Sequence, residues 1–471
     1  MKKLYILLLV AFAAVSCESF VDIVPKGMTI PTTVDNFGDM MNNGSFAMGG
    51  DGYTMTDISY CVNFLELLSD DFAPSENPAS VYYNVFRNTP FLYNTIIWNN
   101  EIFTLADEDN NWNGLYKSNY VANFVLDNID DAEPGVSYTR ETVKGRALIH
   151  RAYNYFELVN LYGKQYNAAT ASSDLGVPLV LESNINNRYP RATVAEVYEQ
   201  ILKDLDLAIQ IMDNSNPEFN NAPGKATAYA LRARVYLWMQ DYDKAYADAT
   251  AALNFRSTLI DYNTCFQYMP GIPAYGIGGY DTNRYTNPEI LYLRYKTESM
   301  LAPYSEKLMA ITDTQNDLRW TLFMGALEMS GVMEPVNWTR ILNSGINIAE
   351  VWLTKAEAAL RKSSSNVNEA LEALNYLRQH RYAAATYQPV TTTDKDQLLT
   401  EILNERRREL VFTEFSFLEK KRLNADPKTA QGMSRTVYGQ SYSMPVGDPR
   451  WQLLIPYNVM EMNDKLVQNE R

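Results

Sequence analysis

Apolar residues recur every three or four positions in several long segments, which is the spacing of one face of an α-helix. The clearest segments are residues 112–129, 142–162 and 193–212. The third begins with Thr193 three residues before Glu196, the form of a capping box at a helix start. The pattern therefore predicts a mainly helical chain.

Two further segments have the form of helical hairpins. Residues 225–239 and 244–253 are rich in alanine and are separated by a short Asp-Tyr-Asp turn, and residues 346–361 and 366–380 repeat the arrangement. Small residues where helices cross, with an aromatic residue at the bend, are typical of tetratricopeptide units. Ordinary αα-hairpins are the alternative, but two hairpins with one pattern favour true repeats, which specify a scaffold rather than a function.

Two long stretches lack this periodicity. Residues 69–98 and 262–285 are dense in Tyr, Asn, Asp, Pro and Gly. They are too aromatic for disorder, and long ordered loops within a compact domain are usually functional. We therefore expect an all-α fold (mainly), in which helical repeats pack against an irregular, loop-rich region, with residues 53–471 forming a single domain.

The first residues have the pattern of a secretory signal. Lys2 and Lys3 precede an unbroken apolar run at 4–15, and a cysteine follows at Cys17. The run is too short to cross a membrane, which takes about 20 residues. A cysteine at the expected cleavage site is similar to a bacterial lipobox, although Ala14 stands where leucine is usual. Residues 1–16 are thus predicted to be a lipoprotein signal peptide, Cys17 an acylated anchor, and residues 17–52 the anchor with an extended tether.

The charge of the chain narrows the choice of partners. The formal net charge is -15. Because residues 1–16 contain two lysines and no acid, the chain without them carries about -17. Such a protein repels phosphate backbones, so nucleic acid is not an expected partner. The arginine run at 406–408, flanked by Glu405 and Glu409, is interpreted as a solvated, salt-bridged helix face.

Residues for catalysis or metal binding are scarce. The chain has only His150 and His380, and we find no zinc-protease, phosphate-loop or nucleophile-elbow motif. His150 is interpreted as a structural histidine. A pair of carboxylates for glycoside hydrolysis remains open among the 56 acidic residues. No catalytic residue, metal ligand or cofactor is predicted, and Cys61 and Cys265 either pair or remain buried thiols.

Aromatic residues are the main candidates for ligand binding. The chain contains 33 Tyr and 7 Trp. Sugars present apolar C–H faces that stack on flat rings, while Asn, Asp and Arg side chains take their hydroxyl groups. The alternative is that these rings pack the loops onto the helices. The candidate ligand-binding residues are Tyr82, Tyr83, Arg87, Trp98, Asn99, Tyr275, Tyr280, Asp281 and Tyr285.

Several segments, in order, resemble the SusD/RagB family of surface lipoproteins from Bacteroidetes-type nutrient uptake systems. They are CESFVDIVPKG from Cys17, VKGRALIHRAYNYFELVNLYGKQY, DLGVPLV, LLTEILNERRREL and WQLLIPYNVMEMNDKLVQNE. The resemblance covers nearly the whole chain. The segment FTEFSFLEKKRLN departs from it, because the family often has Glu-Gly-x-Arg followed by Trp or Phe there.

The resemblance implies a function and a location. It implies tetratricopeptide-like units packed against ligand-side loops, and an outer-membrane lipoprotein that faces the cell exterior. It also implies a non-enzymatic role as the lid of a SusC-like TonB-dependent transporter, holding a glycan or oligosaccharide. A peptide ligand and a purely structural lid are the alternatives, and a surface glycoside hydrolase is a third.

Overall fold

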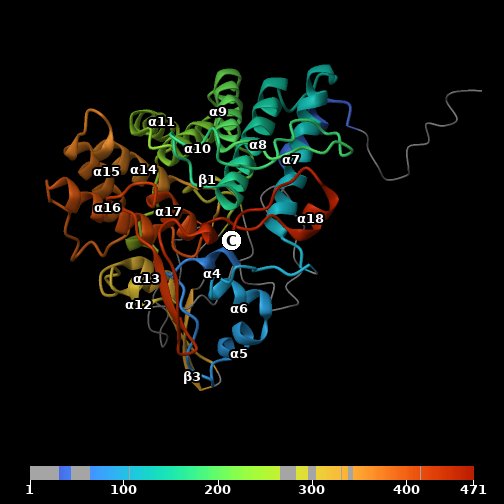
Figure 1. The fold of residues 1–471 in the computed structure, drawn as a ribbon. Helices are drawn as coiled ribbons and strands as arrows, with labels where there is room; N and C mark the ends of the chain where they lie inside the picture. Colours follow the sequence, from blue (N-terminus) through green and yellow to red (C-terminus); the bar gives the residue numbers. More distant parts are fainter. Residues whose placement is uncertain are drawn as a thin grey trace, which may run out of the picture.

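The computed structural model describes residues 31–43, 64–105, 107–265, 283–294, 304–329, 331–337, 343–413 and 415–471. These residues form a mainly helical protein, as predicted (Figure 1). Cys17, Cys61, Tyr275, Tyr280 and Asp281 lie outside the described residues. Cys265 is a free, buried thiol.

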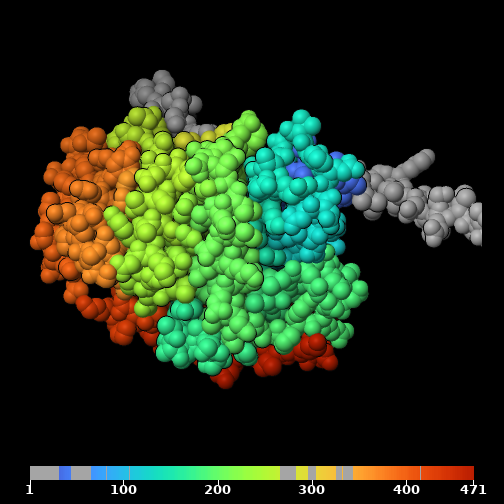
Figure 2. Space-filling view, turned by 90° about the horizontal axis from the view of Figure 1, so that it is seen from above, coloured from blue at the N-terminus to red at the C-terminus, as the bar shows by residue number. Residues whose placement is uncertain are grey.

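Apart from α16, the long helices match the segments predicted from the sequence, with ends that differ by a few residues. They pack side by side in chain order, and Figure 2 shows this order as a succession of colours from cyan through green to orange. Their bounds are α7 Asn110–Asn128, α8 Arg140–Tyr162, α9 Val194–Ile211, α10 Lys225–Trp238, α11 Tyr242–Phe255, α14 Ile348–Arg361, α15 Val367–Gln379 and α16 Lys395–Glu409.

Local chemistry explains where these helices begin and how closely they pack. The predicted capping box is present, because the Thr193 hydroxyl oxygen accepts a hydrogen bond from the N–H of Glu196 and the Glu196 carboxylate accepts one from the N–H of Thr193. The two predicted hairpins are the pairs α10–α11 and α14–α15. Buried alanines such as Ala230, Ala245 and Ala358 let neighbouring helices approach. Helix α8 is central, since every residue from Gly145 to Tyr162 is buried.

The second part of the molecule consists of short elements. Residues 69–98 are more regular than expected, because α5 starts at the N-cap Ser80 and α6 starts with Pro90, which suits the first turn of a helix. The remaining short helices are α2 Val34–Met41, α4 Phe64–Leu68, α5 Val81–Asn88, α6 Pro90–Ile96, α12 Glu306–Met309, α13 Leu318–Phe323, α17 Phe415–Leu423 and α18 Tyr457–Met462.

Three antiparallel strand pairs complete the described fold. They are β1 (Ile290–Tyr292) with β4 (Ile346–Asn347), β2 (Met324–Met329) with β3 (Val332–Asn337), and β5 (Met433–Val437) with β6 (Gln440–Met444). In Figure 1 the β5–β6 hairpin descends toward α5 at the lower end of the molecule. This hairpin and α5 approach each other although they lie far apart in the sequence.

The arginine run at 406–408 corrects the solvated-face interpretation. Arg406 is 1% exposed and Arg408 is 8% exposed. Because successive helical positions point about 100° apart, the run reaches three parts of the fold: Arg406 pairs with Glu350 and Glu419, Arg407 with Asp71, and Arg408 with Glu405. The run therefore ties α14, α17 and the segment after α4 to α16.

Within the described ranges, no helix has the length and the apolar character needed to cross a membrane.

Candidate ligand-binding site

Two of the predicted aromatic residues are buried. Tyr82 is 3% exposed and Trp98 is 2% exposed. The Trp98 indole N–H donates a 2.8 Å hydrogen bond to the carbonyl of Leu68, and the guanidinium of Arg435 lies 4.2 Å from its ring centroid. These rings pack the loop region against the body, which was the alternative considered from the sequence.

Tyr83 and Arg87 lie together at the surface. They are one helical turn apart on α5, and the Arg87 Nη1 donates a 2.7 Å hydrogen bond to the Tyr83 hydroxyl. The Tyr83 side chain is half-buried, whereas Arg87 is exposed. These two predicted residues therefore share one site.

The other predicted residues do not join this pair among the described contacts. Asn99 is exposed and donates a 3.1 Å hydrogen bond to Asn94. Tyr285 is 36% exposed, and its carbonyl accepts from the N–H of Asn220, next to the start of α10. Their roles in ligand binding remain predictions.

The β5–β6 hairpin supplies residues that the sequence analysis missed. Tyr438 packs edge-on against Tyr83, with ring centroids 4.7 Å apart, and lies nearly parallel to Tyr93 at 6.1 Å. The hydroxyls of Tyr93 and Tyr442 share a 3.3 Å hydrogen bond. We call Tyr83, Arg87, Tyr93, Tyr438 and Tyr442 the tyrosine cluster.

The tip of the hairpin has an unusual backbone. Val437 pairs with Gln440, so Tyr438 and Gly439 form a two-residue turn, with φ angles of 49° and 75°. Such a turn needs a positive φ at both positions and favours Asn-Gly. The left-handed region costs roughly 1–2 kcal/mol for a residue with a side chain. Tyr438 is therefore an unfavourable choice for the turn alone.

A carboxylate fixes this tip in place. Glu76 accepts hydrogen bonds from the N–H of Tyr438 at 2.7 Å and from that of Gly439 at 3.1 Å. The Tyr438 hydroxyl donates to the backbone carbonyl of Tyr83 at 3.0 Å. The ring of Tyr438 is thus held by contacts at both ends, and such preorganisation lowers the entropy lost on binding a ligand.

Two hydroxyls of the cluster have a raised pKa. The hydrogen bond with Tyr93, with desolvation adding to it, raises the pKa of Tyr442 to about 12. Burial, with the neighbouring Tyr83 and Glu76 adding to it, raises the pKa of Tyr438 still further. These hydroxyls therefore remain protonated at physiological pH; Tyr438 donates to the carbonyl of Tyr83 and Tyr442 to the side chain of Gln440, and both hydroxyl oxygens can accept hydrogen bonds.

Buried charges anchor the hairpin to the body. Burial alone would raise the pKa of Asp70, but Lys420 and Lys307 outweigh it and hold the pKa at about 2. Lys307 also donates to the carbonyl of Ser434 in β5 at 2.8 Å. Arg435 donates to the carbonyl of Leu67 at 2.8 Å. The strands that carry Tyr438 are therefore tied to α4 and its flanking residues.

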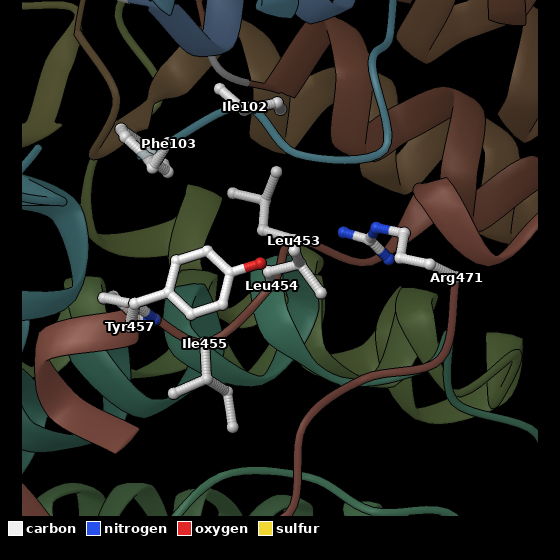
Figure 3. A pocket seen from close by; sticks show the side chains of 8 residues that line it. Ile102, Phe103, Leu453, Leu454, Ile455, Tyr457 and Arg471 are labelled. Atoms are coloured by element: carbon white, nitrogen blue, oxygen red, sulfur yellow. The ribbon is translucent and has the colours of Figure 1, made fainter. Parts of the chain in front are cut away.

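Two hollows lie away from the cluster. One, of about 220 Å³, lies between α16 and α17 and is bordered by Asn404, Arg407 and Lys420. Figure 3 shows the other, an apolar crevice in which the hydroxyl of Tyr457 points toward Leu454 and Arg471 lies at one side. Its volume of about 10 Å³ leaves room for about one water molecule.

His150 occupies a structural position, as the sequence analysis proposed. Its ring nitrogens contact the Tyr292 hydroxyl at 2.6 Å and the carbonyl of Met41 at 3.0 Å. Burial, together with the charge of Arg294, lowers its pKa to about 3. The imidazole is therefore neutral at physiological pH.

The structure thus combines a helical-repeat scaffold with a half-exposed aromatic cluster formed by α5, α6 and the β5–β6 hairpin. Residues 64–237 match a family described as starch-binding associating with outer membrane, and residues 339–471 match the SusD family. The chain belongs to the SusD/RagB family.

Individual relatives agree with this assignment. A SusD-like protein P2 from Formosa agariphila is 31% identical over 160 residues, which span 32% of this chain and 29% of that protein. The crystal structure of a SusD superfamily protein from Bacteroides thetaiotaomicron matches with a TM-score of 0.69 and 22% identity, over 93% of this chain and 100% of the other. A putative sugar binding protein from Bacteroides vulgatus matches with a TM-score of 0.69 and 22% identity, over 94% and 99%. These structural matches establish the fold.

Proposed function

We propose that this protein is a lipid-anchored, cell-surface glycan-binding protein that acts as the lid of a SusC-like TonB-dependent transporter in the outer membrane. The family descriptions support the carbohydrate and the outer-membrane parts of the proposal. The lipoprotein signal before Cys17 supports the anchor. The partnership with a transporter is proposed from the family resemblance alone.

The observation that carries glycan binding is the turn at Tyr438. The chain keeps a bulky residue at a left-handed position where asparagine would be more favourable. Its ring thereby joins Tyr83 and Tyr93 in a half-exposed cluster. Backbone strain of this kind is concentrated at binding sites. The cluster offers flat apolar faces for sugar C–H groups and protonated hydroxyls for sugar hydroxyls.

The cluster favours binding over hydrolysis. Glycoside hydrolysis normally needs two carboxyl groups on opposite sides of the scissile bond. Among the described residues, Glu76 is the acid that contacts the cluster, and both of its oxygens accept hydrogen bonds from the turn. We therefore propose no catalytic role.

The Tyr438→Asn variant tests the proposal. Asparagine suits the left-handed turn, so the hairpin should remain while the ring is lost. Affinity electrophoresis against a panel of neutral and charged polysaccharides should show retardation of the wild-type protein, and the variant should bind about tenfold more weakly or worse, as expected from losing a stacked ring. Tyr120→Asn, at an exposed tyrosine on α7, is the control for losing a surface ring.

The outcomes separate the alternatives. Equal retardation of wild type and Tyr438→Asn would place glycan binding elsewhere. Binding to peptides but to no polysaccharide would show that the ligand is a peptide and not a glycan. New reducing ends after incubation with a polysaccharide would support the alternative of a surface glycoside hydrolase. Normal uptake in cells that carry Tyr438→Asn would favour a purely structural lid.

A further inference from the structure

Arg87 is the exposed cation of the tyrosine cluster. The carbon at the centre of its guanidinium lies 5.5 Å from the ring centroid of Tyr83 and 5.8 Å from that of Tyr438. One N–H group is used by the Tyr83 hydroxyl. A guanidinium has several further donors in a rigid fork. The side chain is thus oriented by neutral groups, with donors left for another partner.

No carboxylate lies within ion-pair distance of Arg87 in the part of the chain that the structure describes. The buried arginines of the body differ: Arg319, for example, contacts Asp317, Glu405 and Glu409. The acid on the cluster, Glu76, is engaged by the two N–H groups of the hairpin turn. The charge of Arg87 is therefore not neutralised by a direct protein partner.

The charge of Arg87 affects which ligands the tyrosine cluster can bind. The chain as a whole carries a net charge of -15, which repels an approaching anion. An oriented, exposed guanidinium next to stacking rings offsets this repulsion locally, and an oxyanion with two acceptor oxygens matches its fork. A neutral sugar would use the rings and leave the fork to water.

We infer that Arg87 makes the tyrosine cluster selective for glycans that carry an anionic group, a carboxylate or a sulfate. This inference rests on the proposed glycan binding and adds a ligand class to it. The rings would hold the sugar face, and the Arg87 fork would hold the oxyanion.

The test uses charged polysaccharides and their own neutral derivatives. Polygalacturonate is compared with carboxyl-reduced polygalacturonate, alginate with carboxyl-reduced alginate, and carrageenan with desulfated carrageenan, by calorimetry and affinity electrophoresis. Wild-type protein should bind at least one charged polymer about tenfold more tightly than its neutral derivative, as expected for a charge-assisted fork. Salt should weaken the charged complex more than the neutral one. The pairs also distinguish carboxylate from sulfate.

Arg87→Gln should remove this difference, because the affinity for the charged polymer should fall about tenfold more than the affinity for the neutral derivative. Arg87→Lys should restore part of it, because it keeps the charge and loses the fork. Arg188→Gln is the control for the loss of an exposed arginine, since the Arg188 side chain is 58% accessible, pairs with Asp464 at 3.5 Å and lies outside α5. It changes the net charge equally and should leave binding intact.

Three results would overturn the inference. They are equal binding of a charged polymer and its neutral derivative, binding of neutral polysaccharides alone, and an undiminished preference for the charged polymer in Arg87→Gln. If neither charged nor neutral polysaccharides bind the wild-type protein, the proposed function itself fails and the inference fails with it.

Discussion

The helical-repeat body and the tyrosine cluster both place arginines beside aromatic rings, but their exposure differs. In the body, the guanidinium of Arg234 lies 4.2 Å from the ring of Phe415, and it is 1% exposed and paired with Glu350. In the cluster, Arg87 is exposed beside Tyr83, and its described contacts are with tyrosines. The same residue types thus stabilise the fold where they are buried beside acids, and the arginine remains exposed to solvent where it has no such partner.

Removing an acid from the body should have the largest effect on stability. Glu405 is fully buried and pairs with Arg319, Arg378 and Arg408. Glu405→Ala leaves three guanidinium groups without this partner, so the free energy of unfolding should fall by about 3–5 kcal/mol. Urea unfolding measures it, with the exposed Glu372→Ala as control, for which a change below about 0.5 kcal/mol is expected. A loss under about 1 kcal/mol in Glu405→Ala would contradict the contrast between the regions.

Acid should destabilise the body through Glu357. Burial would raise the pKa of this carboxyl, but Arg422 and Arg361 outweigh it and hold the pKa at about 2, against about 4.5 when unfolded. The folded form therefore binds its proton less readily, and the stabilisation of about 3 kcal/mol is complete above pH 4.5 and lost as the pH falls toward 2.

Unfolding in urea at a series of pH values between 7 and 3 measures this dependence. Glu357→Gln should be less stable than the wild type at neutral pH, and the difference should shrink as the pH falls below 4.5. A difference that stays constant over this range would show that the Glu357 carboxyl is not responsible.

Trp98 and Tyr83 should separate stability from binding. Trp98→Phe loses the hydrogen bond to Leu68 and part of a buried ring, so about 1–2 kcal/mol of stability should be lost while glycan affinity stays the same. Tyr83→Ala should weaken glycan binding and have a smaller effect on the free energy of unfolding. Calorimetry for binding and urea unfolding for stability provide both readouts. Loss of glycan affinity in a folded Trp98→Phe protein would show that Trp98 contributes to ligand binding.

The smallest effect on stability is expected at the hairpin tip. Tyr438→Asn loses ring contacts and the hydrogen bond to Tyr83 but relieves the left-handed backbone, so the two changes should offset each other to within about 1 kcal/mol. Urea unfolding checks this. A loss well above 1 kcal/mol would mean that the ring serves the fold and that strain is a poor guide to the site.

Apolar spacing and capping signals predicted the helices well because both act within a few residues of the chain. The box at Thr193 and the two alanine-rich hairpins needed no distant partner to be identified. The arginine run at 406–408 was misinterpreted because the local sequence shows flanking acids but not Glu350 on α14 or Asp71 after α4. A buried network of charges depends on contacts between distant segments.

Two of the five residues of the tyrosine cluster followed from the sequence. Tyr83 and Arg87 were candidates because they lie in the tyrosine-rich stretch 69–98, which was expected to be an irregular ligand-side loop. Tyr93, Tyr438 and Tyr442 were missed. The signal for Tyr438 was a two-residue Tyr-Gly turn between alternating residues at 433–444, which predicts a hairpin but not the surface on which its tip rests.

The sequence by itself determined the helical-repeat class, the signal before Cys17 as a prediction, and the family resemblance, because periodicity and motif order are written along the chain. Only the tertiary structure decided which rings are open. Tyr82 and Tyr83 are neighbours in sequence, yet adjacent positions on a helix point in different directions, so one ring is buried and the other joins a tyrosine more than 350 residues away. Exposure is a property of packing, and packing brought α5 and the β5–β6 hairpin together.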